Sequence, residues 1–145
     1  IQCTTQASVT IDQKLYSEIG KGFLVLIGIC DEDTKETADK MVRKLIGMRI
    51  FSDENGKTNL ALKDVDGQLL LVSQFTLYAD CKKGNRPSFV KAGSPQHANE
   101  LYEYIIDACK KEVPVVKTGV FGAEMEVALI NDGPFTIILD SKDLA

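Results

Sequence analysis

The stretch Leu69–Asp80, which reads LLLVSQFTLYAD, constrains the fold of this chain more than any other. Its first four residues are all apolar, and such a run is typical of a short strand that is buried on both faces. Two hydroxyls and an amide follow at once, on Ser73, Thr76 and Gln74. Polar side chains so close to a core must find hydrogen-bond partners or line a cavity. We therefore expect a central strand whose end either forms a satisfied turn or faces a binding site.

The length of 145 residues is enough for one domain with a real core, and we expect a single domain over residues 1–145. No apolar run approaches the roughly 20 residues that a membrane helix needs. The apolar run FLVLIGIC at residues 23–30 also lacks the features of a secretory signal, so no membrane partner is expected. Because the first residue is Ile1 rather than Met, we expect that a few residues before it are missing.

The cysteines do not have the spacing of a metal site. None of the four forms a CxxC pair, and the single histidine, His97, lies in a helix start. Neither a zinc site nor a disulfide framework is expected, and the sequence suggests no metal and no cofactor. Free thiols are typical of a reducing compartment, so we expect a cytoplasmic location.

The charge of the chain is unevenly distributed. A net charge of −4 argues against broad, non-specific binding of nucleic acid, which depends on a basic surface. Residues 81–91, CKKGNRPSFVK, nevertheless carry four cations and no acid. This segment is either an ordinary solvated loop or a local site for an acidic partner.

The hydrophobic periodicity predicts a β-rich chain with two helices. One helix is expected to begin at an Asp33 cap, with Glu36 completing a capping box, and to end at Gly47; the other is expected to begin at a Ser94 cap with Pro95 in its first position. Residues 58–67 are expected to be a loop. Strands are expected at residues 7–11, 15–19, 23–30, 49–51, 69–72, 113–117, 125–130 and 135–139. This pattern predicts an α+β fold with a curved, largely antiparallel sheet or open β-barrel.

A second informative stretch is NDGPFT, residues 131–136. Since it lies between two apolar segments, its composition predicts a hairpin turn. The Gly133–Pro134 bond is also a candidate for the cis form, which costs only about 0.5–1 kcal/mol before proline. A rigid cis Gly-Pro would point two carbonyl oxygens in a fixed direction. It could therefore recognise a ligand by shape and backbone alone.

LLLVSQFTLYAD and NDGPFT together resemble the D-aminoacyl-tRNA deacylase family. The resemblance extends over the chain, because ASVTID, GFLVLIGI, MRIF, KKGNRPSF and TGVFGAEM also occur in the order found in that family. The family hydrolyses the ester between a D-amino acid, or glycine, and the terminal adenosine of tRNA, and it acts as a homodimer. The resemblance thus implies a proofreading hydrolase with tRNA as its partner.

The resemblance also implies roles for particular residues. The pocket would contain the catalytic segment, with amides near Gln74 and Phe75 as an oxyanion hole and the Phe75 ring against the terminal adenine. The Gly133–Pro134 segment would reach into the partner's pocket, hold the substrate α-amino group and exclude an L side chain. The implied catalytic residues are Ser73, Gln74, Phe75 and Thr76; the further pocket residues are Phe121, Gly122, Ala123, Met125 and Asn131; the tRNA-binding residues are Lys82, Lys83 and Arg86.

Two questions stay open at the sequence level. Thr76 is either a nucleophile, which would need an adjacent base, or a pocket wall; no base lies beside it in the motif, so we favour assistance by the ribose 2′-hydroxyl of the substrate. Cys3 stands where the family has an arginine that supports the Gly-Pro turn, and a thiol lacks the five donors of a guanidinium. Either another residue supports the turn, or it is held less firmly. The alternatives are a binding module without hydrolysis and a relative that accepts some L-aminoacyl-tRNA.

Overall fold

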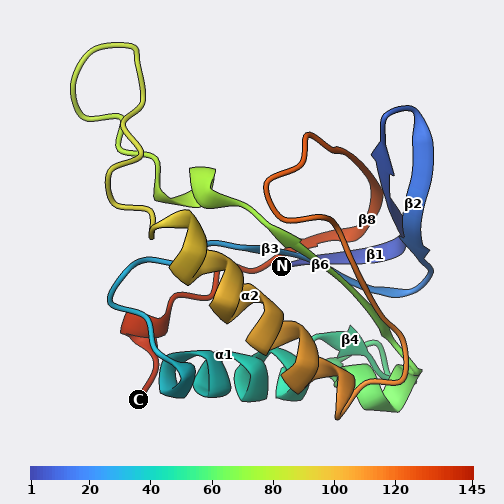
Figure 1. The fold of residues 1–145 in the computed structure, drawn as a ribbon. Helices are drawn as coiled ribbons and strands as arrows, with labels where there is room; N and C mark the ends of the chain where they lie inside the picture. The colour runs from blue at the N-terminus through green and yellow to red at the C-terminus, as the bar shows by residue number, and fades with distance from the viewer.

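The computed structural model describes residues 1–145 and contains a six-stranded sheet with both helices against one face (Figure 1). The sheet strands are β1 (Gln2–Ile11), β2 (Lys14–Ile19), β3 (Gly22–Ile27), β6 (Gln68–Ser73), β7 (Val116–Thr118) and β8 (Glu126–Thr136). A separate hairpin contains β4 (Phe51–Ser52) and β5 (Thr58–Leu60); the helices are α1 (Lys35–Gly47) and α2 (Pro95–Lys110), with short 3₁₀ helices η1 (Leu62–Val65), η2 (Phe75–Tyr78) and η3 (Ser141–Asp143). None of these helices has the length and apolar character to cross a membrane.

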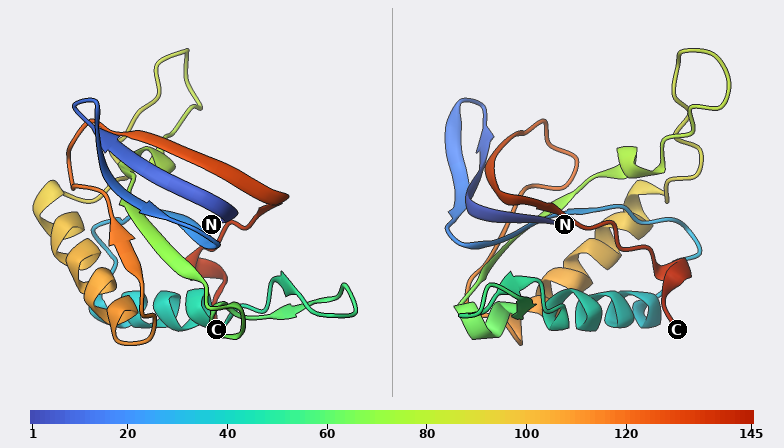
Figure 2. Two further views of the ribbon diagram at one scale, coloured as in Figure 1. Left: turned by 90° about the vertical axis from the view of Figure 1, so that its right-hand side faces the viewer. Right: turned by 180° about the vertical axis from the view of Figure 1, so that it is seen from behind.

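The sheet has the order β2-β1-β3-β6-β7, and β8, which lies outside this order, also pairs with β1 (Figure 2). β1 is antiparallel to β2, β3 and β8, whereas β3–β6 and β6–β7 are parallel. The predicted α+β fold with two helices and a curved, barrel-like sheet is confirmed. The sheet is mixed, however, because each helix lies within a crossover: α1 between β3 and β6, and α2 between β6 and β7. A strand that returns after such a crossover is parallel to the one before it.

The central strand β6 is buried on both faces, as predicted. Leu69 and Leu71 belong to the core cluster between the sheet and the helices, and Leu70 and Val72 to a second cluster on the opposite face of the sheet. The buried Tyr102 hydroxyl on α2 donates a hydrogen bond of 2.7 Å to the Leu71 carbonyl. Burial raises the pKa of Tyr102 to about 12, so this donor keeps its proton at neutral pH. The contact fixes α2 against the strand that leads to residues 73–76, the SQFT segment.

The start of α1 differs from the prediction by one residue. The cap is Thr34, whose hydroxyl accepts the Thr37 N–H at 3.2 Å while the Thr37 hydroxyl accepts the Thr34 N–H at 3.2 Å. The prediction that Asp33 caps the helix and forms a capping box with Glu36 is therefore wrong. The Asp33 carboxylate accepts the Cys30 N–H at 2.9 Å instead, within the turn that follows β3. The predicted end of α1 at Gly47 and the Ser94–Pro95 start of α2 are confirmed.

Residues 58–67 are not a loop, since they contain β5 and η1. The Asp53 carboxylate organises the turn before β5 by accepting the N–H groups of Asn55 and Lys57, each at 2.9 Å. The short β4–β5 hairpin is stabilised locally by these bonds, which the loop prediction overlooked.

The predicted hairpin turn at residues 131–134 is also wrong, because β8 continues along β1 on both sides of it. Thr4 lies opposite Asn131 and Gln2 lies opposite Thr136. Only Cys3 separates the two positions on β1, whereas residues 132–135 separate them on β8. The extra residues form a bulge in a continuous strand. Turn-forming residues thus make the chain protrude here without reversing it.

Candidate functional site

The polar end of β6 lies at an edge of the sheet where three strand ends meet. Since β3, β6 and β7 are parallel, the segments that follow them emerge on the same side. Ser73, at the end of β6, lies opposite Ile27 of β3, and the Gly119 N–H after β7 donates to the Leu71 carbonyl at 3.1 Å. The topology thus places SQFT and the TGVFGAEM segment beside each other.

The backbone after β6 leaves one of the two expected oxyanion donors free. The Gln74 N–H donates to the Ile27 carbonyl at 2.7 Å, so this amide is occupied by a bond within the sheet. The Phe75 N–H is at the first position of η2, where an amide has no partner within the helix. This amide remains available to a ligand. The Phe75 side chain is 57% exposed, which leaves its ring accessible too.

Gly28 allows η2 to pack against the end of β3. A β-carbon at this position would lie 3.0 Å from the Leu77 β-carbon and 3.3 Å from the Tyr78 ring. Any residue with a side chain at position 28 would push η2 away from the end of β3. This close approach fixes the position of the segment that carries Thr76.

The Thr76 hydroxyl has no base as a partner. It accepts a hydrogen bond of 2.8 Å from the Gln74 side-chain amide, a group that does not take up a proton. The ring of His97 is bonded to the Asp33 carbonyl at 2.9 Å. The observed contacts hold the threonine in place and do not activate it as a nucleophile.

The loop after β7 is closed by a sulfur contact. The Val120 N–H donates to the Met125 sulfur at 3.5 Å, and a β-carbon on Gly119 would lie 2.5 Å from that sulfur. The ring of Phe121 lies 6.2 Å from that of Tyr102 between centroids. Gly122 has a φ of +77°, which favours glycine in this turn. Phe121, Gly122, Ala123 and Met125 therefore form a folded loop beside the end of β6, as a pocket wall requires.

The Gly133–Pro134 bond is cis and both residues are exposed on β8. Two strands, β1 and β3, lie between β8 and β6 in the sheet order, a separation of three strand spacings or roughly 14 Å along a sheet. Asn131 lies at the base of this bulge and not in the SQFT wall. Within one chain the predicted site residues thus form two groups, and no hydrogen bond joins them.

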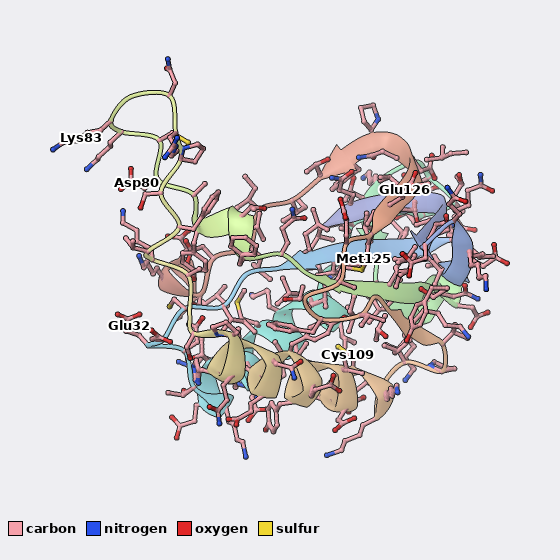
Figure 3. All side chains as sticks on the ribbon, turned by 45° about the horizontal axis from the view of Figure 1, so that its top comes forward. Glu32, Asp80, Lys83, Cys109, Met125 and Glu126 are labelled. Atoms are coloured by element: carbon pink, nitrogen blue, oxygen red, sulfur yellow. The ribbon has the colours of Figure 1, made fainter.

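The basic segment forms a projecting loop next to SQFT. Asp80 and Ser88 exchange backbone hydrogen bonds of 2.8 and 2.9 Å, so the residues between them extend from the body; Figure 3 shows Lys83 on this loop and Asp80 at its base. The Phe89 ring meets the Phe75 ring edge-on at 5.2 Å, a contact that sequence reasoning missed. Phe89 thus connects the loop to the pocket.

The charges of this loop are largely free. Lys91 pairs with Asp80 at 3.3 Å, and the Lys82 N–H and the Lys91 ammonium hold the pKa of the Asp80 carboxyl below its usual range. Lys82, Lys83 and Arg86 have no acidic partner. These three exposed cations form a basic patch on the projecting loop.

A cavity with a volume of about 370 Å³ lies away from this site. It lies between α1, the end of β3 and residues 136–141, and it touches the SQFT segment only through Leu77 and Tyr78. Phe75, Thr76 and Leu77 are exposed, so this part of the surface is open to solvent in one chain.

Comparison with known proteins gives one consistent result. The family model of D-Tyr-tRNA(Tyr) deacylase matches residues 1–140. The D-aminoacyl-tRNA deacylases of Clostridium novyi and Thermosipho africanus are 52% and 50% identical over 142 residues, which is 98% of this chain and 95% of each relative. Among solved structures, the c-Myc DNA unwinding element binding protein has a TM-score of 0.90 at 41% identity, covering 96% of this chain and 95% of that one. A probable eukaryotic D-amino acid tRNA deacylase shares the fold, with a TM-score of 0.78 at 18% identity over 91% and 92% of the two chains.

Proposed function

The chain belongs to the D-Tyr-tRNA(Tyr) deacylase family and hydrolyses D-aminoacyl-tRNA, and from this premise we propose that two copies of the chain complete each active site. The observation that carries the proposal is the separation of SQFT on one side of β3 from Gly133–Pro134 on β8. A substrate of the size of an amino acid does not span both within one subunit. A second subunit whose bulge faces the SQFT segment removes this difficulty.

The free edge of the sheet supports a homodimer. β8 pairs only with β1, so its outer edge presents unpaired backbone groups over eleven residues. Phe75 and Leu77 are each 57% exposed, and Ile138, just beyond β8, is 93% exposed. Long open edges and exposed apolar side chains are rarely left uncovered in soluble proteins.

In the proposed pocket, catalysis depends on positioning the ester and stabilising its oxyanion. The Phe75 N–H is the donor aimed at the carbonyl oxygen as it becomes negative. Since Thr76 bonds only to an amide, its hydroxyl acts as a wall. The ribose 2′-hydroxyl next to the ester takes part by relaying a proton from a water molecule that attacks the carbonyl carbon. The bond from that carbon to the ribose 3′-oxygen then breaks, this oxygen takes up the proton, and the free amino acid leaves; the lability of an aminoacyl ester makes such positioning sufficient.

The proposed chiral gate is the exposed Gly133–Pro134 segment of the partner. Its carbonyl oxygens accept hydrogen bonds from the substrate α-amino group, and its backbone occupies the space where an L side chain would lie. Because this gate recognises the substrate through backbone atoms, its recognition does not depend on which D side chain is present. Substrates with different side chains, and glycine, are therefore expected to be accepted.

The tRNA phosphates near the acceptor end are proposed to contact Lys82, Lys83 and Arg86. These cations project beside the pocket and have no acidic partner, as phosphate contacts require. The exposed Phe75 ring is placed to pack against the terminal adenine. The four free thiols are consistent with a cytoplasmic location, where charged tRNA is used.

The test is single-turnover hydrolysis of D-tyrosyl-tRNA and L-tyrosyl-tRNA by the purified protein, with a chelator present. Rapid loss of the D ester alone is expected. Loss of both esters would contradict the gate and favour the relative with relaxed chirality. Loss of neither would contradict the hydrolase and favour a module that binds the aminoacyl end.

A further inference from the structure

The bulge in β8 must be held in shape by side chains. Opposite the single residue Cys3, residues 132–135 leave the regular ladder and their backbone groups lose the partners that a continuous strand would supply. An unsupported bulge of this length would sample many shapes. The position of Gly133 and Pro134 therefore depends on whatever closes its base.

The Asn131 side chain closes the base. Its Oδ1 accepts the Phe135 N–H at 2.7 Å, and its Nδ2 donates to the Thr136 hydroxyl and to Gln2 Oε1, both at 3.1 Å. Because a backbone N–H can only donate, the first bond fixes which end of the Asn131 amide is oxygen. Its nitrogen must then meet an acceptor, which Gln2 supplies from the neighbouring strand.

Cys3 does not perform this role. Its side chain is 5% exposed and belongs to the cluster beneath the helices, facing away from that of Gln2, since successive side chains of a strand point to opposite faces. Burial, and then the nearby Asp132 carboxylate, raise the pKa of the Cys3 thiol, which keeps it neutral. The support of the bulge thus comes from the position beside Cys3.

We infer that Gln2 is a positioning residue of the chiral gate, acting through Asn131 on the Gly133–Pro134 segment. The inference rests on the proposed function, because it gives the gate its role. Gln2 touches no substrate; it orients Asn131, and Asn131 sets how the bulge projects. Gln2 is thereby a specificity determinant in place of the arginine that the resemblance led us to expect at position 3.

The experiment compares Gln2→Leu, which removes the acceptor, with Gln2→Glu, which keeps an oxygen for the Asn131 amide. The hydrogen-exchange rate of the Phe135 amide measures how often the bulge opens, and this measurement needs no substrate. The ratio of kcat/KM for D-tyrosyl-tRNA to kcat/KM for L-tyrosyl-tRNA measures how strongly the gate excludes the L substrate. Gln2→Leu is expected to speed exchange about fivefold and to lower the ratio about fivefold, the effect of one lost neutral hydrogen bond, and Gln2→Glu is expected to restore both.

Gln6→Leu is the matched control, since Gln6 is an exposed glutamine of β1 without a side-chain hydrogen bond, and it is expected to change neither reading. An unchanged Phe135 exchange in Gln2→Leu overturns the inference whatever the activity. Faster Phe135 exchange in Gln2→Leu with an unchanged D/L ratio of kcat/KM also overturns the inference. The Pro134→Ala variant then shows whether the role of Gln2 or the gate itself was wrong. If Pro134→Ala lowers the ratio, the gate stands and only Gln2 is excluded; if Pro134→Ala leaves it unchanged, the proposed gate itself fails.

Discussion

Thr76 shows how one contact separates two mechanisms. Its hydroxyl accepts a hydrogen bond from the Gln74 amide, and it forms no hydrogen bond with a carboxylate, an imidazole or an amine. A hydroxyl without a base is a poor nucleophile at neutral pH. The same contact orients the side chain, which suits a wall that excludes water from part of the pocket.

Substitution of Thr76 tests this assignment. We expect Thr76→Ala and the isosteric Thr76→Val to keep kcat on D-tyrosyl-tRNA within about tenfold of the unmodified protein, because neither removes an attacking group. Single-turnover rates measure the effect. A loss near 10⁴-fold in both variants, on the scale seen when a covalent nucleophile is removed, would instead identify Thr76 as the nucleophile.

At the scale of elements, the proposed recognition of the substrate depends on the projecting loop and the bulge, and the sheet holds both in place. The loop is closed by the Asp80–Ser88 pair and connected to the pocket by the Phe75–Phe89 contact. Its three unpaired cations are therefore held near the pocket although the loop itself is exposed. This arrangement agrees with the proposal that the three cations contact phosphates at the acceptor end of tRNA.

Replacing Lys82 and Lys83 together with alanine is expected to weaken tRNA binding and to flatten its dependence on salt. Each lost phosphate contact lowers the slope of log K against log salt by about 0.7–0.9, so the pair should lower it by about 1.5. Binding measured across a salt series checks this. Lys110→Ala with Lys111→Ala, an equal loss of charge at the end of α2, should leave the slope unchanged; equal effects of the two pairs would refute a local site.

The sequence correctly predicted the elements whose residues are compatible with only one structural environment. Four apolar residues at Leu69–Val72 indicated a strand buried on both faces, and Pro95 after Ser94 indicated a helix start. The cap of α1 could not be read in this way, because Asp33 and Thr34 are both good caps and the choice depends on the Cys30 N–H that Asp33 satisfies. The NDGPFT bulge was misread because turn residues serve hairpins and bulges alike, and only pairing with β1 on both sides distinguishes them.

At the scale of the whole molecule, one chain holds the two halves of the proposed site apart, so activity should require association. Ile138 is 93% exposed next to β8, and a charge there costs the isolated subunit little. We expect Ile138→Lys to shift the protein from dimer to monomer and to abolish deacylation. Sedimentation and single-turnover assays measure both. Leu15→Lys on β2, another exposed apolar position, is the control, and a dimeric, active Ile138→Lys protein would contradict the shared site.

The pairing of the first strand with the last has a consequence for how the protein is made. Ile1 and Ile137 exchange hydrogen bonds of 2.8 Å across almost the entire length of the chain. As the polypeptide leaves the ribosome, β1 can find β2 and β3 early, but its pairing with β8 has to wait until residues 126–136 have emerged. Such late, non-local closure slows folding and leaves a strand edge exposed to neighbouring chains in the meantime. The nascent protein is thus most prone to aggregation while β1 waits for β8, and the segment that completes this pairing is also the one that carries the proposed gate.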